Sequence, residues 1–541
     1  MTLPPAPSTP ERTAPPAARP LAASRGVDPV ARLFRRWLGI VFLVAWASLG
    51  SQLDVLVGSR GLLPARDLFR ALETHPELTF WDVPTVFRWG ASDDALHAGI
   101  WAGVVLGLCI VFDVVPRVAL GASTLLYLSY AVVARTFLSF QWDNLLLECG
   151  FLGVFLPTKR RSRWAVFLLK LLLFKLYFES GIAKYESYLG DWKDGSAMAY
   201  YYETAPIPTR LAWYAHHTPL WFHALESRAT LVFEILVPFA IFGPRPARLV
   251  ALVVFTGFQI LNIATANYGF FSYLALVLGL VLLDGRDVRR LHAAFRHAAR
   301  RLPSASRPFL RALRRTRVAY RLVLRRAARD ARRLAAPLTP HDDTLLYLLR
   351  LSVASVVTVA YVVVSFSDAL GNFARDATNE PPGASLSAAI APFRIVNTYH
   401  LFGSITRERV EPTFETFDGA RWTEHDLHDK PGDPKRAPPF VAPHQPRVDF
   451  QLWFYGLGAD RGVPAYVARL LERLCSDPNA VASLFVGPLP AAPQAVRVAF
   501  YHYHFTTAAE RRTTGAYWKR EPIYSPRTLG CTGGPGEDSE E

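Results

Sequence analysis

The sequence predicts a polytopic α-helical membrane bundle of about nine spans, followed by a mainly β domain outside the cytoplasm. Three observations support this fold class. The 541 residues are 51% hydrophobic and only 19% charged, against about 25% charged in soluble domains. The apolar residues form long runs that are nearly free of charge, and the strongly basic segments fall between alternate runs. After Phe366, spanning runs end.

The first span is expected at Trp37–Val57, directly after Arg32, Arg35 and Arg36. Residues 1–31 are rich in Pro, Ala, Ser and Thr, which is typical of a disordered tail, here on the cytoplasmic side. The apolar run is longer than the core of a cleaved signal peptide, so it predicts a retained anchor with its N-terminus inside.

The remaining spans complete a bundle over residues 32–283 that carries an outer loop at 184–228, and a final helix at 344–366 returns the chain to the outside. Two of the runs are short, which suits tilted or protein-buried segments. Spans are expected at 97–115, 117–140, 143–157, 163–183, 229–243, 247–265 and 269–283.

The basic residues set the orientation. The net charge is +15, and residues 285–340 alone hold 17 Arg and 2 Asp, which also gives +15. Beside membrane helices such a block marks the cytoplasmic face and attracts anionic lipid, so 284–343 is expected to be an Arg-rich cytoplasmic loop with an amphipathic helix near 310–324. We do not expect nucleic acid as a partner, because the basic block is explained by the membrane.

Residues 367–525 are expected to form the extracytoplasmic β-rich domain, with a flexible tail at 526–541. Alternating stretches at 448–453 and 496–503 predict strands, and 417–420 predicts a hairpin turn. A helix is expected near 464–475. Cys475 and Cys531 both lie in this region, so they are predicted to be able to form a disulfide on the oxidising side.

Ionisable side chains within spans are costly, so their positions are informative. The outer halves of spans four and five carry such residues, and an antiparallel hairpin would bring these halves together. The candidate polar site consists of Asp143, Glu148, Lys175, Glu179 and Lys184. One hypothesis is an outward-opening polar cavity. The alternative is a set of interhelical pairs, such as Lys175 with Glu179, that hold the bundle together.

The outer loop is dense in aromatic residues and contains His216, His217 and His223 together with Glu226. Metal binding is not favoured here, because His217 and Glu226 lack a helical spacing and a second carboxylate–His pattern is missing from the sequence. Phosphate-binding, dinucleotide-binding and nucleophile-elbow motifs are also missing, so we expect neither a cofactor nor a metal.

Several long motifs resemble the lipase maturation factor family. The resemblance begins at GSRGLLP (58–64) and QWDNLLLECGFL (141–152). It continues through YYETAPIP (201–208), WYAHH (213–217), NYGFF (267–271), NTYHLFG (397–403), KPGD (430–433) and PPFVAPHQPRVD (438–449). Within these motifs the outer loop and the domain contribute Gln141, Trp142, Glu203, His216, His217, Asn397, His444 and Arg447.

The resemblance implies a polytopic membrane protein with a large C-terminal domain. In animals the family lies in the endoplasmic reticulum membrane and helps secreted lipases to fold and assemble as dimers. It is also similar, distantly, to membrane enzymes such as the vitamin K-dependent carboxylase. The composition, rich in Arg, Ala and Pro, is typical of a GC-rich bacterial genome, which predicts a bacterial inner membrane with the C-terminal domain outside the cytoplasm.

Three functions compete at this stage. The first is a membrane-bound maturation or assembly factor for exported proteins, with a lipase-like client as its partner. The second is a membrane enzyme that uses the outer polar cavity, and the third is a lipid-binding or transport protein. A chaperone needs exposed apolar surface on the C-terminal domain, whereas an enzyme needs polar groups that converge on an accessible site. The family resemblance makes the first the leading hypothesis, and the residues alone leave all three open.

Overall fold

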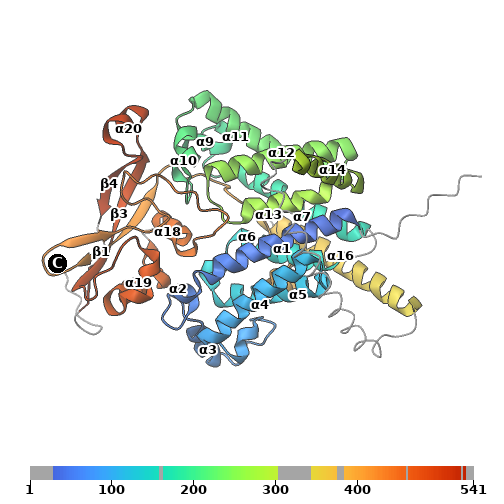
Figure 1. Cartoon of the computed structure of the whole chain (residues 1–541), viewed down its shortest axis with the longest axis horizontal. Coiled ribbons are helices and arrows are strands. Elements are labelled where there is room, and N and C mark those ends of the chain that lie inside the picture. Colours follow the sequence, from blue (N-terminus) through green and yellow to red (C-terminus); the bar gives the residue numbers. More distant parts are fainter. Residues whose placement is uncertain are drawn as a thin grey trace, which may run out of the picture.

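The computed structural model describes residues 28–156, 162–301, 343–373, 383–458, 461–524 and 528–531. Helices of the bundle run along the long axis of the molecule, and a small antiparallel sheet lies beyond one end of them (Figure 1). The elements of the bundle are α1 (Pro29–Gly50), α2 (Leu53–Val57), α3 (Ala65–Glu73), η1 (Val86–Trp89), α4 (Asp93–Phe112), α5 (Pro116–Val133), η2 (Arg135–Leu138), α6 (Gln141–Val154), α7 (Arg163–Tyr185), α8 (Asp191–Asp194), α9 (Ala197–Thr204), α10 (Arg210–His216), α11 (Leu220–Ile235), η3 (Val237–Phe242), α12 (Arg245–Thr265), α13 (Phe271–Gly279), η4 (Leu280–Leu282), α14 (Gly285–Arg301) and α16 (Asp343–Phe373).

Among the described residues, five helices are long and apolar enough to cross a membrane. They are Pro29–Gly50, Asp93–Phe112, Pro116–Val133, Arg245–Thr265 and Ser352–Gly371. The protein is therefore a helical membrane protein, but the structure does not establish nine spans. Of the other expected spans, α6 has 14 residues and α13 has 9, too few to cross about 30 Å of hydrocarbon unaided.

The short helix α6 lies at the centre of the bundle, where it packs against α1, α5, α7 and α13. Almost all of its side chains are buried, and its neighbours include the long helices that face outward. A short or polar helix is tolerated at membrane depth when protein surrounds it. By contrast, only 17% of the span in α12 is buried, so this helix presents most of its apolar surface to lipid.

Several boundaries differ from those expected from the sequence. Helix α1 begins at Pro29, where Asp28 caps it by accepting a hydrogen bond from the backbone N of Val30. Helix α1 ends at Gly50, so the rest of the expected first span forms the separate helix α2. Helix α11 begins at Leu220, within the expected outer loop, and the rest of that loop folds into α8, α9 and α10.

The C-terminal part begins with α17 (Ala384–Ile390) and η7 (Ala391–Phe393) and then forms a sheet in the order β2-β1-β3-β4, with β5 paired to β3. The predicted turn at 417–420 is confirmed, because Phe417 pairs with Trp422 across it, and the predicted strand at 496–503 lies within β3. The strands are β1 (Val410–Phe417), β2 (Trp422–His425), β3 (Ala495–Phe505), β4 (Trp518–Tyr524) and β5 (Leu529–Gly530).

The predicted strand at 448–453 is wrong, because these residues belong to helix α18 (Arg447–Leu457). The alternation of apolar and polar residues suggested one buried face. In the structure the polar Asp449 and Gln451 are buried together with Val448 and Phe450, so the helix is covered on several sides. The spacing of its apolar residues therefore does not distinguish a helix from a strand.

The helix predicted near 464–475 is confirmed as α19 (Ala465–Ser476), and η9 (Pro478–Ala480), η10 (Ala482–Leu484) and α20 (Ala508–Thr514) complete the domain. The domain therefore mixes helices with a small antiparallel sheet rather than being mainly β.

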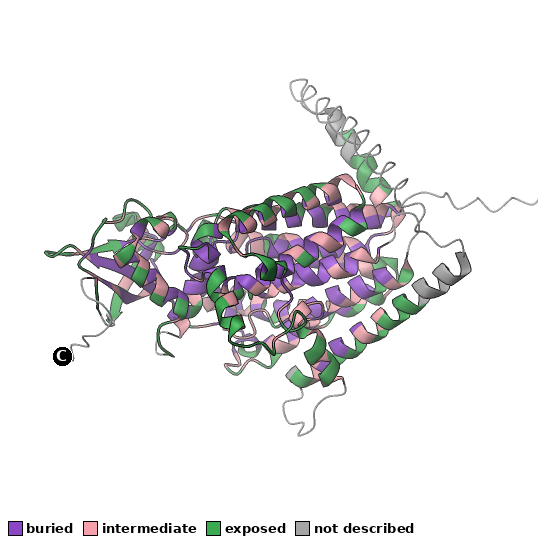
Figure 2. Ribbon diagram, turned by 90° about the horizontal axis from the view of Figure 1, so that it is seen from below, coloured by how far each residue is buried: buried purple, intermediate pink, exposed green. Residues whose placement is uncertain are grey.

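Helix α14 forms the start of the Arg-rich segment, at the end of the molecule opposite to the sheet (Figure 1). The amphipathic helix expected near 310–324 lies outside the described residues, as do most of the expected tails at 1–31 and 526–541. Buried residues run through the centre of the bundle and on into the sheet domain (Figure 2). They form one continuous hydrophobic core that reaches from α1 to β4.

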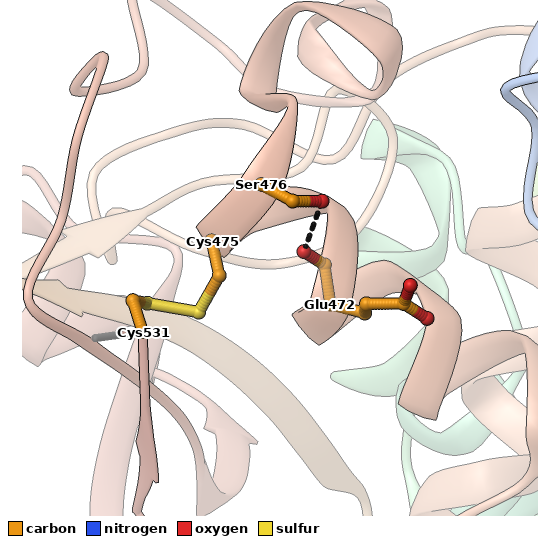
Figure 3. The surroundings of a disulfide bond; sticks show 4 residues. All are labelled: Glu472, Cys475, Ser476 and Cys531. Carbon is orange, nitrogen blue, oxygen red and sulfur yellow. Dashed lines mark hydrogen bonds between the residues drawn. A yellow bond between two sulfur atoms is a disulfide. The ribbon is translucent and has the colours of Figure 1, made fainter. Parts of the chain in front are cut away.

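The predicted disulfide between Cys475 and Cys531 is confirmed (Figure 3). Cys475 lies near the end of α19 and Cys531 follows β5, and their Cα atoms are 5.1 Å apart. The bond closes a sequence separation of 56 residues and fixes the C-terminal strand to the helix beside the sheet. Disulfides persist in oxidising compartments, which is consistent with a domain outside the cytoplasm.

We predict that Cys475→Ser lowers the free energy of unfolding of the C-terminal domain by about 2–4 kcal/mol, because the cross-link restricts the unfolded chain. The thermal midpoint of the detergent-solubilised protein should fall, and Cys531 should become reactive to maleimide. Cys109→Ser, in α4, is the control and should change neither measurement. An unchanged midpoint in Cys475→Ser would contradict the stabilising role.

Candidate functional site

Asp143 and Arg447 form a buried ion pair that joins the bundle to the C-terminal domain. Asp143 lies in the first turn of α6, and Arg447 is the first residue of α18. The guanidinium donates to both carboxylate oxygens, at 2.6 and 2.9 Å, and Tyr127 donates its hydroxyl to the same carboxylate at 2.6 Å. Burial by itself lowers the pKa of Arg447, but the Asp143 carboxylate raises it above its ordinary value.

Glu148 lies at the centre of a second buried cluster. Its carboxylate is 3.3 Å from the Nζ of Lys175 in α7 and accepts a hydroxyl hydrogen bond from Tyr361 in α16. Tyr399 donates its hydroxyl to Glu148 at 2.6 Å, and Asn397 donates its side-chain amide at 2.9 Å. Four donors from three separate parts of the chain thus meet on one fully buried carboxylate.

Asn397 and Tyr399 belong to a stretch that we call the inserted segment, residues 394–405, which lies between η7 and β1. Its polar groups bond to one bundle element after another. At its start, Arg394 donates to the carbonyl oxygens of Leu138 and Ala131, and near its end the backbone N of Ile405 donates to Asp191 at 2.8 Å. The segment therefore fastens the C-terminal part along the outer ends of α5, α6, α7 and α8.

Glu179 and Lys184 also bond to the inserted segment. Glu179 accepts a hydrogen bond from the backbone N of Tyr399 at 2.9 Å. Lys184 donates to the carbonyl oxygen of Leu401 at 2.8 Å and forms an ion pair of 2.6 Å with Glu234 in α11. Lys175 forms its ion pair with Glu148. The alternative hypothesis had paired Lys175 with Glu179.

A small cavity of about 60 Å³ lies beside Lys184 and Glu234. A water needs about 10–15 Å³ on the same measure, so the cavity has room for a few waters. Of the five candidate residues, Lys184 lines it, whereas the other four lie outside its lining. The wall consists of Leu176, Tyr177, Ser180, Lys184, Trp192, Met198, Tyr201, Thr230, Glu234, Phe258, Gln259, Asn262, Tyr268, Phe271, Leu401 and Phe402.

Three further motif residues also lie where the two parts meet. Gln141 accepts a hydrogen bond from the backbone N of His400 at 3.1 Å. The ring of Trp142 packs against Phe450 of α18, with centroids 4.9 Å apart. His444 contacts the hydroxyl of Ser48 in α1 at 3.0 Å.

Glu203 anchors the outer loop to the sheet. Its carboxylate accepts the backbone N of Phe505 at 2.7 Å and lies 3.1 Å from His504. His216 lies 3.7 Å from Glu203, and burial lowers the pKa of His216. The Nδ1 atom of His217 lies 2.6 Å from the carbonyl oxygen of Trp213 in α10. In the part of the chain that the structure describes, His, Cys, Asp and Glu residues form no group of three or more able to hold a metal ion.

Arg409 and Lys430 form a further buried cluster that sequence reasoning missed. Glu411 forms ion pairs with Arg409 at 2.6 Å and with Lys430 at 2.7 Å, and these side chains are about 1% exposed or less. Arg409 also donates to the carbonyl oxygen of Glu203 at 2.8 Å. Burial lowers the pKa of Lys430 to about 8, although Glu411 opposes the shift. Lys430 is the first residue of the KPGD motif, and this motif was the feature of the sequence that could have pointed to the cluster.

The five candidate residues are each at most 4% exposed, and all of them have protein partners. A catalytic group needs access to a substrate, whereas a buried charge needs compensating partners. The geometry therefore suits joints between the bundle and the C-terminal part. It does not present a free acid or base in an open cleft.

The same two parts are recognised by comparison with known proteins. Residues 30–290 match the lipase maturation factor transmembrane domain, and residues 395–526 match the lipase maturation factor C-terminal domain. Lipase maturation factor 2 of Homo sapiens is 30% identical over 578 residues, which cover 91% of this chain and 81% of that protein.

The chain belongs to the lipase maturation factor family. Lipase maturation factor 2 of Gallus gallus is also 30% identical, over 90% of this chain and 79% of that protein. Lipase maturation factor 1 of Bos taurus is 28% identical, over 91% of this chain and 87% of that protein. The resemblance noted in the sequence is thus confirmed over most of this family member. No solved structure matches it.

We predict that Arg447→Met lowers the free energy of unfolding by about 3–5 kcal/mol, because it leaves the buried Asp143 carboxylate without its partner. The double variant Asp143→Leu with Arg447→Met should recover much of this loss, since neither charge remains. The thermal midpoints of the detergent-solubilised variants measure both effects.

The matched control is Arg469→Met. Arg469 also links the two parts, through a partly exposed ion pair of 3.4 Å with Asp67, and such pairs contribute about 1 kcal/mol or less. Equal losses for Arg447→Met and Arg469→Met would contradict the special role of the buried pair.

Proposed function

We propose that the protein is a membrane-bound maturation factor for exported lipases. The observation that carries this proposal is the family membership over both domains in the same order. Its relatives are named lipase maturation factors 1 and 2. The helical bundle anchors the protein in the membrane, and the C-terminal domain binds the client on the outer side.

The contacts at the candidate site support this division of labour. The buried pairs at Asp143 and Glu148, together with Glu203 on the outer loop, hold the sheet domain in one orientation on the bundle. A domain fixed in this way keeps its client-binding surface at a constant height above the bilayer. A client that emerges from the export machinery would meet it there.

Phe440 is our candidate for a client contact on this surface. Its side chain is 61% exposed, although it lies within the motif at 438–449. The backbone on either side is fixed, because Asn267 donates to the carbonyl oxygen of Pro439 and accepts the backbone N of Val441. An exposed aromatic ring on a rigid backbone is the kind of group that contributes strongly to binding, since little entropy is lost.

For the location, we propose a bacterial inner membrane with the C-terminal domain outside the cytoplasm. Helix α14, which is rich in arginine, lies at the end of the bundle opposite to the sheet (Figure 1). Basic residues favour the cytoplasmic side, and the disulfide favours the opposite side for the domain. The Arg- and Ala-rich composition supports a bacterial source.

We predict that alkaline phosphatase fused after Tyr524 is active in Escherichia coli, because this enzyme folds only outside the cytoplasm. The same fusion after Arg301 should be inactive. Green fluorescent protein at the two positions is the reciprocal control and should fluoresce only after Arg301. The reverse pattern at both positions would contradict the orientation.

We predict that a host lacking this protein exports a lipase whose specific activity is reduced about tenfold while the amount of lipase polypeptide is unchanged. The wild-type gene should restore activity. Phe440→Ser should not, provided that its own level in the membrane is normal. Val463→Ser, a similarly exposed apolar site in the domain, is the control and should restore activity. Full activity in the absence of the protein would refute a maturation role.

A further inference from the structure

An apolar groove runs along one side of the bundle between α1, α13 and the start of α14. Its volume is about 1020 Å³, far larger than the polar cavity beside Lys184. Its walls are almost entirely hydrocarbon. They consist of Leu33, Trp37, Ile40, Val41, Val44, Phe270, Tyr273, Leu276, Val277, Leu280, Val288, Leu291, His292, Ala294 and Pro443.

The length of the groove matches one leaflet of a bilayer. From Leu33 to Val44 along α1, and from Phe270 to Leu280 along α13, a helix rises by about 15–17 Å. Half of a hydrocarbon core of about 30 Å is about 15 Å. Pro443, Phe270 and Tyr273 line the groove at the end nearer the sheet. The groove therefore has room for one acyl chain that enters from the other end.

The other end of the groove is basic. Val288, Leu291 and His292 of α14 line it, and the exposed Arg289 lies in the same helix turn, with its guanidinium over Gly285 beside Pro29 at the start of α1. Two carboxylates close to this end are already engaged by arginines. Asp287 is paired with Arg245, and Asp284 is paired with Arg248 at 3.0 Å. The mouth of the groove therefore carries a positive charge.

We propose that this groove binds one anionic phospholipid of the membrane, with an acyl chain along α1 and α13 and the headgroup against Arg289. A transmembrane helix of a partner fits less well, because such a helix is about 10–12 Å wide and must cross both leaflets. A zwitterionic lipid fills the same groove but gains less from Arg289. One cation near an anionic headgroup contributes about fivefold in affinity, so Arg289 favours the anionic lipid by about fivefold.

The test uses the full-length protein in nanodiscs of phosphatidylcholine that contain a trace of phosphatidylglycerol with a photoreactive group on one acyl chain. After illumination, mass spectrometry identifies the labelled peptides. We expect label on α1 and on α13, and a competition in which unlabelled phosphatidylglycerol is about fivefold more effective than phosphatidylcholine. Label spread evenly over the lipid-facing helices would refute the site.

Two variants separate the acyl chain from the headgroup. Ile40→Trp fills the groove and should reduce labelling several-fold, whereas Val253→Trp, on the exposed face of α12, should not. Arg289→Glu should leave the acyl chain able to bind but abolish the preference for phosphatidylglycerol. Arg512→Glu on α20, at the opposite end, is the charge control.

The remaining outcomes also decide the question. Phosphatidylglycerol labelling that survives both Ile40→Trp and Arg289→Glu would overturn the proposal. A groove that is protected from all lipid because two copies of the protein associate through it would also overturn it, and cross-linking between copies in the same nanodiscs would detect this case.

Discussion

The structure depends on the burial of the Glu148 carboxylate in the middle of the bundle. A charge at this depth is tolerated only if donors surround it. Lys175 is the only one of its four side-chain partners that comes from the neighbouring helix of the hairpin. Tyr361 comes from the last long helix, and Asn397 and Tyr399 come from the inserted segment. The packing of α16 and the course of the chain after it therefore follow from the need to satisfy one acid that was placed much earlier in the sequence.

The same division of roles recurs along the junction. The N-terminal part supplies the acids, Asp143, Glu148, Glu179 and Glu203, while the C-terminal part supplies donors to each of them. Replacing a buried ion pair with apolar residues often costs little stability, so these pairs are better explained by orientation than by stability. Apolar contact alone tolerates sliding. A bidentate arginine on Asp143 and a backbone N–H on Glu203 fix the domain at two separate points, and in doing so they fix its direction on the membrane.

Much of this fold could be predicted from the sequence, because hydropathy and turn chemistry are local. The long apolar helices, the turn at 417–420, the strand at 496–503 and the pair Cys475–Cys531 all follow from short stretches or from the side of the membrane on which they lie. Helix α18 could not be predicted in this way, since its polar residues are buried by other elements. The alternation of apolar and polar residues therefore did not mark a strand with one buried face. Glu148 and Lys175 were named as candidate residues, but the partners of Glu148, Tyr361 and Tyr399, were not. An aromatic residue in an apolar stretch gives no sequence signal that its hydroxyl forms a hydrogen bond.

The arrangement also makes the two family domains one folding unit. Without the C-terminal part, Asp143 would lose Arg447, Glu148 would lose two of its four donors, and Glu179 would lose the backbone N–H of Tyr399. Buried carboxylates that lose donors are costly. Without the bundle, Arg447 at the start of α18 and the polar backbone of the inserted segment would be equally without partners. The bundle is therefore completed only when the chain has crossed the membrane for the last time and the inserted segment has docked. The C-terminal domain therefore takes up its fixed orientation only after the bundle that holds it is itself complete.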